Sequence, residues 1–286
     1  MRVLMVGATG RHAHWALRAL VDRGVVVRAL VRSQQRAQAA MDGGAQETVI
    51  ADLTRPATLA AAMIGVDGVF HIGPGQTPTE ADMGVAMVEA AAAAGVRKFV
   101  LSGVIHPSIS ALTNHTAKLP VEDALYISDM DFTVLQPARF MQMIEDYWIV
   151  EDDRLALPYS LSSRMCWVDY RDVAEVAAMA MTETSLSYGT YELCAPGLLD
   201  GHDTAAILSE VVGRPITAVQ TPLAEFAAQP PEGPRRDGFR RMMVHYDRRG
   251  LPGGNALVLR TILGREPRTL KDYFEGLADR GATTTG

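Results

Sequence analysis

The chain opens with Arg2-Val-Leu-Met-Val-Gly7-Ala-Thr-Gly10-Arg-His-Ala13, an apolar run that leads directly into a glycine turn. Gly7 lets the backbone turn sharply, and Gly10 carries no Cβ that would block a pyrophosphate. Ala13 is small enough for a following helix to pack closely on a sheet, and the first N–H groups of that helix attract anions. The stretch predicts a dinucleotide site made by Gly7, Thr9, Gly10, Arg11 and His12.

The spacing of this motif is G-x-x-G-x-x-A rather than G-x-G-x-x-G, so its context matters. Apolar residues recur at helical spacing from Ala13 to Val21, and Gly24 stands where a glycine commonly ends a helix. A second apolar strand is expected over Val25–Val31. The complete strand–helix–strand pattern favours the dinucleotide site over the alternative, a glycine turn in some other βα unit.

Basic and hydroxyl side chains follow the second expected strand. Arg32 and Ser33 come directly after Val31, with Arg36 one helical turn later and no Asp or Glu among them. An acidic residue here would bind the ribose 2′-hydroxyl of NAD, whereas an arginine binds the 2′-phosphate of NADP. The sequence therefore favours NADP over NAD. NAD stays possible, because Arg32 could also be a solvated charge at the end of a strand.

Strands and helices alternate through the first half of the chain. Strands are expected over 46–50, 66–72, 98–102 and 132–136, and a helix over 82–95. This alternation predicts an α/β fold with a doubly wound parallel Rossmann sheet. The pattern changes after Pro137. We therefore expect an NADP-binding core over 1–137 and a smaller, interleaved substrate lobe over 138–286, from which segments at about 165–195 return to the core, namely Met165–Val168 and Thr190–Leu193.

Open α/β sheets bind ligands beyond the carboxyl ends of their strands. We expect Asp52 and Leu53 beside the adenine, and the stretch His71–Pro74, with Ile72 and Gly73, beside the central ribose. Ser102 is expected near the nicotinamide. Asp52 could equally be a turn residue, because Thr54 and Pro56 follow it.

The connection from Ser102 to Lys118 is too long for a simple link, and it gathers His106, His115 and Lys118. Lys118 lies two residues before Pro120, which favours a helix start, so its amine could reach the coenzyme ribose or the substrate. We take these three as candidate catalytic residues. Each histidine could also be a surface or packing residue, and Lys118 a solvated lysine.

Several stretches resemble the NmrA-like family of atypical short-chain dehydrogenases/reductases, including its quinone-reductase members. The resemblance covers most of the chain. It rests on Gly7–Gly10, Val31-Arg32, Ala51–Leu53, Val96–Ser102, His115…Lys118 leading into Val121–Leu125, Phe132–Pro137, Asp169–Val176, Gly189–Leu193, Leu208–Arg214 and Thr261–Pro267. It implies an NADP-binding Rossmann core with a small lobe closing over it.

Ordinary short-chain reductases carry a Tyr four residues before the Lys, but Asn114 stands there relative to Lys118. Asn cannot supply a phenolic proton, so reduction of a simple carbonyl is disfavoured. Quinones and similar conjugated acceptors delocalise the incoming electrons and need less help. The expected activity is thus hydride transfer from NADPH to a small quinone or other aromatic acceptor.

The candidate acceptor-binding residues are Asn114, Phe140, Met141, Tyr147 and Trp148. Aromatic and thioether side chains suit a flat ligand, although a helix that carries them is more often part of a core. The alternative function is a non-catalytic, NADP(H)-sensing regulator that acts through a partner. The missing Tyr fits that alternative as well. A homodimer is possible under either interpretation.

Composition limits the function classes. The 286 residues carry a formal net charge of −6, which gives no electrostatic reason to expect nucleic acid. Only Cys166 and Cys194 are available as thiols, so we expect no disulfide framework and no metal site. The first expected strand starts at the N-terminus, and the alanine-rich stretch near Ala90 is interrupted by charges. We therefore expect no membrane segment and a cytoplasmic protein.

Overall fold

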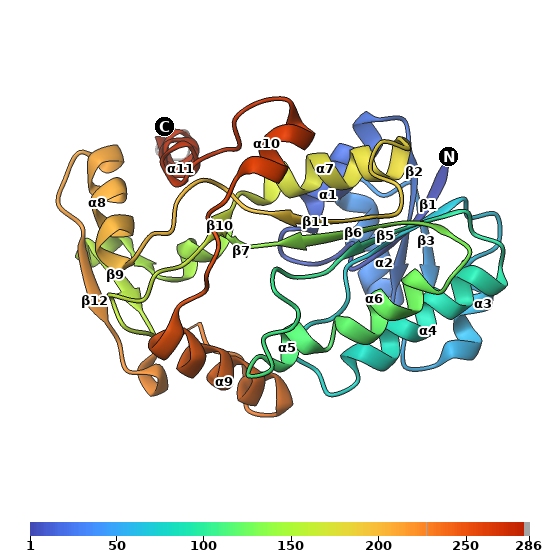
Figure 1. Ribbon diagram of the computed structural model, residues 1–286, viewed down its shortest axis with the longest axis horizontal. Helices are drawn as coiled ribbons and strands as arrows, with labels where there is room; N and C mark the ends of the chain where they lie inside the picture. Colours follow the sequence, from blue (N-terminus) through green and yellow to red (C-terminus); the bar gives the residue numbers. More distant parts are fainter. Residues whose placement is uncertain (227, 283–286) are drawn as a thin grey trace. The chain divides into compact units, whose positions relative to one another are not determined.

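A seven-stranded sheet forms the centre of the fold in the computed structural model, which describes residues 1–226 and 228–282 (Figure 1). The strand order is β11-β6-β5-β4-β1-β2-β3, and the neighbouring strands from β3 to β6 run parallel. The strands are β1 (Arg2–Val6), β2 (Val26–Val31), β3 (Glu47–Ile50), β4 (Gly68–His71), β5 (Lys98–Ser102), β6 (Asp131–Pro137) and β11 (Gly189–Leu193). The predicted α/β Rossmann fold is confirmed, with the topological switch point between β1 and β4.

Most predicted bounds differ from the observed ones by a residue or two. Strand β5 has the bounds that were expected, whereas β4 begins at Gly68 because Val66 still belongs to a turn and donates its N–H to the Met63 carbonyl. The helix predicted over 82–95 is α4 (Glu80–Ala93). Its earlier start places Glu80 in the first helical turn, which matters for the site described below.

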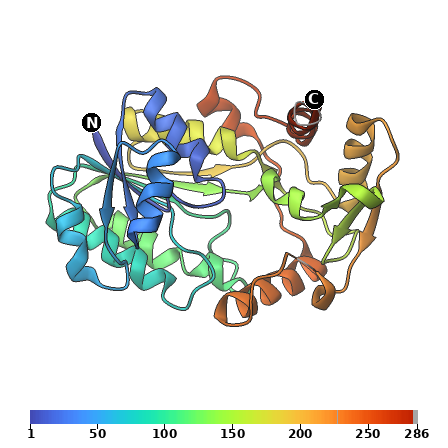
Figure 2. The same cartoon turned by 180° about the vertical axis from the view of Figure 1, so that it is seen from behind.

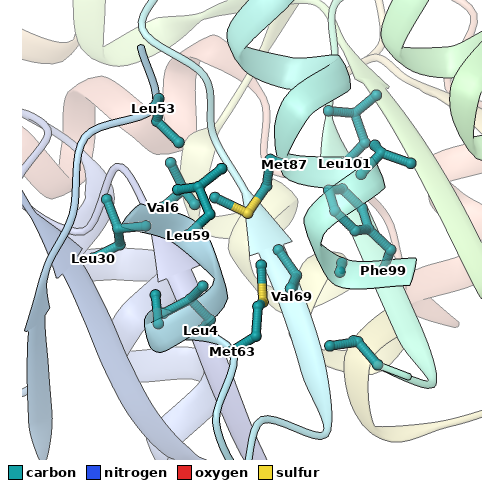
Figure 3. Close-up of a cluster of buried hydrophobic side chains, with 14 of the residues drawn as sticks. Leu4, Val6, Leu30, Leu53, Leu59, Met63, Val69, Met87, Phe99 and Leu101 are labelled. Atoms are coloured by element: carbon teal, nitrogen blue, oxygen red, sulfur yellow. The ribbon is translucent and has the colours of Figure 1, made fainter. Parts of the chain in front are cut away.

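One face of the sheet is covered by α3 (Leu59–Ala62), α4 and α6 (Leu119–Tyr126). Figure 3 shows the apolar cluster beneath them, where Phe99 and Val69 of the sheet meet Met87 of α4 and Leu59 of α3. Burying each such side chain contributes about 2 kcal/mol. This cluster fixes the sheet and these helices to one another, and with them the ends of β4 and β5.

The opposite face carries α1 (Ala13–Asp22) and α7 (Tyr170–Thr182), which lie side by side in Figures 1 and 2. The predicted apolar face of α1 is buried at Ala13, Ala16, Leu17 and Leu20. Arg23, which follows α1, donates to the Thr182 hydroxyl and lies 2.6 Å from the Glu183 carboxylate. Next to α1 in sequence, α2 (Gln34–Asp42) links β2 to β3.

The chain divides into two compact units. The first comprises Met1–Pro137 and Val173–Glu192, and the second comprises Ala138–Asp172 and the residues from Leu193 onward. Thr190–Leu193, expected to return to the core, lies in β11 of the central sheet. Met165–Val168 does not join that sheet, because β10 (Trp167–Val168) pairs instead with β7 (Arg139–Phe140) in the second unit.

The second unit contains a three-stranded sheet and a group of helices. Strand β9 (Arg154–Leu157) lies between β12 (Thr217–Gln220), which is parallel to it, and β8 (Trp148–Ile149), which is antiparallel. The helices of this unit are α8 (Gly201–Val212), α9 (Pro234–Arg249), α10 (Leu257–Leu263) and α11 (Leu270–Ala282), with short 3-10 helices at Met141–Asp146, Val150–Asp152 and Leu223–Glu225. The first unit also contains α5 (Thr113–Thr116) and a 3-10 helix at Pro56–Thr58. Within the described residues, no helix is both long enough and apolar enough to cross a membrane.

A buried arginine lies at the core of the second unit. The guanidinium carbon of Arg139 lies 4.9 to 5.3 Å from the ring centres of Tyr147, Tyr159, Trp167 and Tyr246. Its N–H groups donate to the hydroxyls of Tyr147 and Tyr159, at 2.7 Å in the second case. Burial raises the pKa of Tyr246 to about 12 and also raises that of Tyr147, so both tyrosines stay neutral beside the arginine, which is held by cation–π contacts.

Candidate functional site

The glycine turn after β1 has the geometry that a dinucleotide requires. Gly7 has φ +82°, and a Cβ on it would lie 2.7 Å from the carbonyl oxygen of Ile72, at the end of the neighbouring strand β4. Gly10 donates its N–H to the Gly7 carbonyl at 2.8 Å, and Ala13 donates to the Gly10 carbonyl at 3.1 Å. Only a glycine fits at position 7, and it brings the backbones of two strand ends together.

The start of α1 presents backbone N–H groups, and no acidic side chain in its first turn would compete with a bound phosphate for them. Its first turn contains no acidic residue, and the side chain of the N-cap residue, His12, makes no capping hydrogen bond. Thr9 is half-buried in the turn and Arg11 is exposed. A helix start of this kind favours a bound phosphate. The residues present at the turn therefore fit a dinucleotide.

Arg32 and Asp52 lie beyond the carboxyl ends of β2 and β3. The Arg32 side chain is exposed, and Ser33 caps α2 by accepting the N–H of Arg36. Asp52 accepts both the N–H and the hydroxyl of Thr54, at 2.9 and 2.8 Å. These bonds, with smaller contributions from Arg55 and Arg32, hold the pKa of Asp52 below its usual range. Asp52 thus has the turn role that the sequence left open, and its contact with a coenzyme stays a prediction.

Leu53 lies in the apolar cluster of Figure 3 and is 8% exposed. Ile72 and Gly73 follow β4, half-buried, and Ser102 ends β5 with its side chain buried. The structure therefore places Ile72, Gly73 and Ser102 together at the carboxyl ends of two adjacent strands. Contact of any of them with a coenzyme is a prediction.

A buried polar cluster lies at the end of β4. Lys118 Nζ lies 2.5 Å from Glu80 Oε1, and both side chains are almost completely buried. A Cβ built on Gly73 would lie 3.2 Å from His71 Nε2 and 3.8 Å from Lys118 Nζ. Burial, assisted by the charge of Lys118, lowers the pKa of His71 to about 3, so this imidazole is neutral at physiological pH. Its Nδ1 is buried and has no hydrogen-bond partner among the described residues.

The same end of the sheet holds a second buried carboxyl group. Glu122 of α6 accepts the Gln136 amide at 3.0 and 3.1 Å and the Tyr126 hydroxyl at 3.3 Å. Burial raises the pKa of Glu122, although these two donors and the charge of Lys118 act in the opposite direction. Gln136 belongs to β6, so β4, β5 and β6 all end at buried polar groups.

The two candidate histidines are linked through the backbone. His115 donates its Nδ1–H to the His106 carbonyl at 3.2 Å, which fixes the orientation of the His115 ring. His106 has φ +52° and lies 3.1 Å from the carboxylate of Glu192. His115 is 1% exposed, whereas Asn114, in α5, is half-buried. Lys118 is the N-cap residue of α6, so its predicted place at the start of a helix is confirmed.

The remaining candidates belong to the second unit. None of them lies in an α-helix: Phe140 ends β7, Met141 begins the 3-10 helix over Met141–Asp146, Tyr147 follows that helix, and Trp148 begins β8. Phe140 packs edge-on against Tyr170, with ring centres 4.8 Å apart. Met141 and Tyr147 are 1% and 2% exposed and Trp148 is half-buried. A role in acceptor binding stays a prediction for all four of the candidates Phe140, Met141, Tyr147 and Trp148.

Sequence reasoning missed Glu80, the carboxylate that pairs with Lys118. Glu80 looks like an ordinary acidic residue in the first turn of a helix. The one available signal was the pair of polar residues His71 and Gln136 at the ends of otherwise apolar strands. No group of three or more side chains suited to a metal ion occurs in the described ranges.

Comparison with known proteins places these features in a family. The family model "NmrA-like family" matches residues 1–274. The chain is 33% identical over 230 residues to NAD(P)H azoreductase from Xenophilus azovorans, and the match covers 78% of each chain. It is 26% identical over 238 residues to the photosystem II assembly factor Ycf39 from Synechocystis, covering 78% of this chain and 72% of that one.

Solved structures share the whole fold at lower identity. The NADPH-dependent quinone oxidoreductase QOR2 from Escherichia coli, complexed with NADPH, has a TM-score of 0.79 at 23% identity, covering 96% of this chain and 99% of its own. Triphenylmethane reductase from Citrobacter has a TM-score of 0.80 at 20% identity, with the same coverage. Because the family model spans residues 1–274 and the azoreductase relative is 33% identical over 78% of each chain, the chain belongs to the NmrA-like family.

Proposed function

We propose that this protein is an NADPH-dependent reductase that passes a hydride to a quinone or a similar conjugated aromatic acceptor. The observation that carries the proposal is the turn at Gly7, where a positive φ and the 2.7 Å approach to Ile72 leave room for nothing larger than hydrogen. This turn opens onto the uncapped start of α1, where the pyrophosphate of a dinucleotide would bind.

Arg32 would recognise the coenzyme by its 2′-phosphate. Its exposed guanidinium stands at the end of β2, and the nearby Asp52 carboxylate is already bonded to the N–H and hydroxyl of Thr54. Arginine binds phosphate with two parallel hydrogen bonds, so NADP(H) is the preferred coenzyme. NADPH, when bound, supplies the hydride.

Lys118 and His115 are the residues proposed to act on the acceptor. Reduction of a quinone to a hydroquinone consumes the hydride and a proton, and the developing oxyanion needs a nearby positive charge or proton donor. The Lys118 amine lies at the end of β4, beside Gly73, and can supply both. The His115 imidazole, oriented by the His106 carbonyl, is a second candidate for holding a proton.

Asn114 explains why the acceptor should be conjugated. An amide in the position of the usual Tyr cannot donate a phenolic proton to the alkoxide that carbonyl reduction would leave. A quinone or an azo compound spreads the added charge over several atoms and makes a weaker demand on the protein. The azoreductase relative, at 33% identity, supports an acceptor of this kind.

The experiment is steady-state oxidation of NADPH by purified protein, followed at the nicotinamide absorbance with benzoquinones, naphthoquinones and azo dyes as acceptors. The proposal predicts saturable turnover with at least one class, lowered about a hundredfold in Lys118→Met. Tight binding of NADPH with no turnover across the whole panel would overturn the reductase and would favour a sensor of the coenzyme.

A further inference from the structure

We infer that Glu80 is a positioning residue for Lys118, and that it joins the amine to the loop that follows β4. The inference rests on the proposed function, in which Lys118 acts on the acceptor. Glu80 is 3% exposed, and burying a carboxylate this deeply is costly unless an opposite charge compensates it. Oε1 lies 2.5 Å from Lys118 Nζ, and Oε2 accepts the N–H of Gln76 at 2.7 Å.

The two carboxylate oxygens of Glu80 contact different parts of the chain. The first holds the amine of a residue 38 positions later in the chain, at the start of α6. The second holds the backbone of Gln76, which has φ +61°, a conformation that non-glycine residues adopt only when their surroundings stabilise it. The loop over 72–79 and the amine are therefore fixed by one carboxylate.

The surroundings restrict where the amine can lie. Gly73, with no Cβ, leaves room for both His71 Nε2 and Lys118 Nζ beside the backbone. His71 stays neutral, so it does not compete with Lys118 for the carboxylate. Lysine is a flexible chain with a point charge, and it loses more rotamer freedom than most side chains when it is held. Glu80 supplies the interaction that selects one position.

Glu80 is thus expected to affect the reaction through Lys118, without touching the acceptor. Glu80→Gln keeps the size of the side chain and an oxygen for the Gln76 N–H but removes the charge that holds Lys118. We expect kcat to fall about tenfold while KM for NADPH changes by less than about threefold. Glu80→Asp keeps the charge but withdraws it by one carbon, so its kcat should lie between the two.

The decisive test is a double-mutant cycle with Glu80→Gln, Lys118→Met and the combined variant. If Glu80 acts through Lys118, the double variant loses no more kcat than Lys118→Met alone. The same cycle, measured as urea unfolding without coenzyme, should also show non-additive midpoints, and NADP⁺ titration should give all three variants an affinity within about threefold of wild type.

A matched control exists at the other end of the same strands. Lys98 and Asp131 form a comparable ion pair at the start of β5 and β6, with 3.1 Å between Nζ and Oδ2, in which the lysine is buried and the aspartate is half-buried. Asp131→Asn should lower the unfolding midpoint to a degree comparable with Glu80→Gln but leave kcat unchanged. This comparison separates positioning of Lys118 from simple loss of a buried ion pair.

The outcomes separate the two claims. The positioning role is wrong, and the reductase stands, if wild type oxidises NADPH but Glu80→Gln has wild-type kcat. The same conclusion follows if the fold-loss of kcat in the double variant equals the product of the fold-losses in the two single variants. If wild type neither binds nor oxidises NADPH, the proposed function fails and this inference fails with it. Should Glu80→Gln not fold, Glu80→Asp gives the same decision.

Discussion

Gly7 and Ile72 approach so closely that a Cβ on Gly7 would lie 2.7 Å from the Ile72 carbonyl oxygen. The contact joins the ends of β1 and β4, the two strands on either side of the switch point of the sheet. Ligands of doubly wound folds bind at that point. The relationship therefore ties a steric requirement of the fold to the expected position of the pyrophosphate.

Gly7→Ala should weaken coenzyme binding and stability together. The substitution forces a non-glycine residue into a left-handed conformation and adds the clash, at a cost of about 2 to 4 kcal/mol. We expect a lowered urea midpoint and at least about a tenfold rise in the Kd for NADP⁺ measured by calorimetry.

Gly24→Ala is the matched control. Gly24 also has a positive φ, +74°, but apart from its chain neighbours no described residue has an atom within 4 Å of its Cβ position. This variant should lose about 1 kcal/mol of stability and keep wild-type affinity for NADP⁺. Equal affinity in Gly7→Ala and Gly24→Ala would contradict the assigned position of the pyrophosphate.

Arg32→Ala should change the coenzyme preference. Removing a guanidinium that binds the 2′-phosphate costs about 1.5 to 3 kcal/mol of NADPH binding, or roughly ten- to a hundredfold in Kd, and leaves NADH binding nearly unchanged. Kd values for both coenzymes are measured by fluorescence titration. Arg18→Ala, which removes an exposed arginine paired with Asp22 on α1, should alter neither. A preference that survives in Arg32→Ala would show that another group reads the phosphate.

The lowered pKa of the buried His71 should make the free energy of unfolding depend on pH. Its pKa is lowered from 6.5 to about 3 in the folded protein, so the unfolded chain takes up a proton first as the pH falls. Its contribution to stability is complete above about pH 6.5 and is lost at up to about 1.4 kcal/mol per pH unit toward pH 3.

His71→Gln, which cannot titrate, should show a weaker loss of stability than wild type between pH 7 and pH 4. The measurement is the free energy of unfolding in urea at each pH. His14→Gln, which removes an exposed imidazole on α1, should retain the pH dependence of wild type. Parallel curves for wild type and His71→Gln would mean that His71 is not the group that titrates.

Arg139→Met should destabilise the second unit. The change removes the cation from between four aromatic rings and leaves two buried tyrosine hydroxyls without their donor. We expect a loss of about 3 kcal/mol in the free energy of unfolding. Arg154→Met is the control, since this arginine is exposed and pairs with Asp152 in a surface salt bridge. An effect as small as that of Arg154→Met would show that the cluster contributes little.

The sequence predicted the parts of the site that depend on local pattern. Gly7 is recognisable because a sharp turn after an apolar strand demands it, and Lys118 because Pro120 marks the start of a helix. Glu80 could not be assigned, because its partner lies 38 residues away and only the packing of α4 against α6 brings the two together. A pair of this kind becomes visible only in three dimensions.

The second unit was harder to predict for a related reason. Its strands are only two to four residues long, too short for alternation to be distinguished from chance, and Met165–Val168 therefore resembled a strand of the central sheet. The aromatic residues of Arg139–Val150 suggested a ligand pocket. One of them, Tyr147, instead packs its ring against the buried guanidinium of Arg139, a contact that the spacing of the sequence did not reveal.

The central claim is that the turn after β1 binds NADP(H), and calorimetric titration of the purified wild-type protein tests it most directly. The account predicts one site per chain for NADP⁺ and for NADPH, with NADH bound at least about tenfold more weakly. Absence of binding heat with NADP⁺, NADPH, NAD⁺ and NADH alike, confirmed by an unchanged melting temperature, would contradict it.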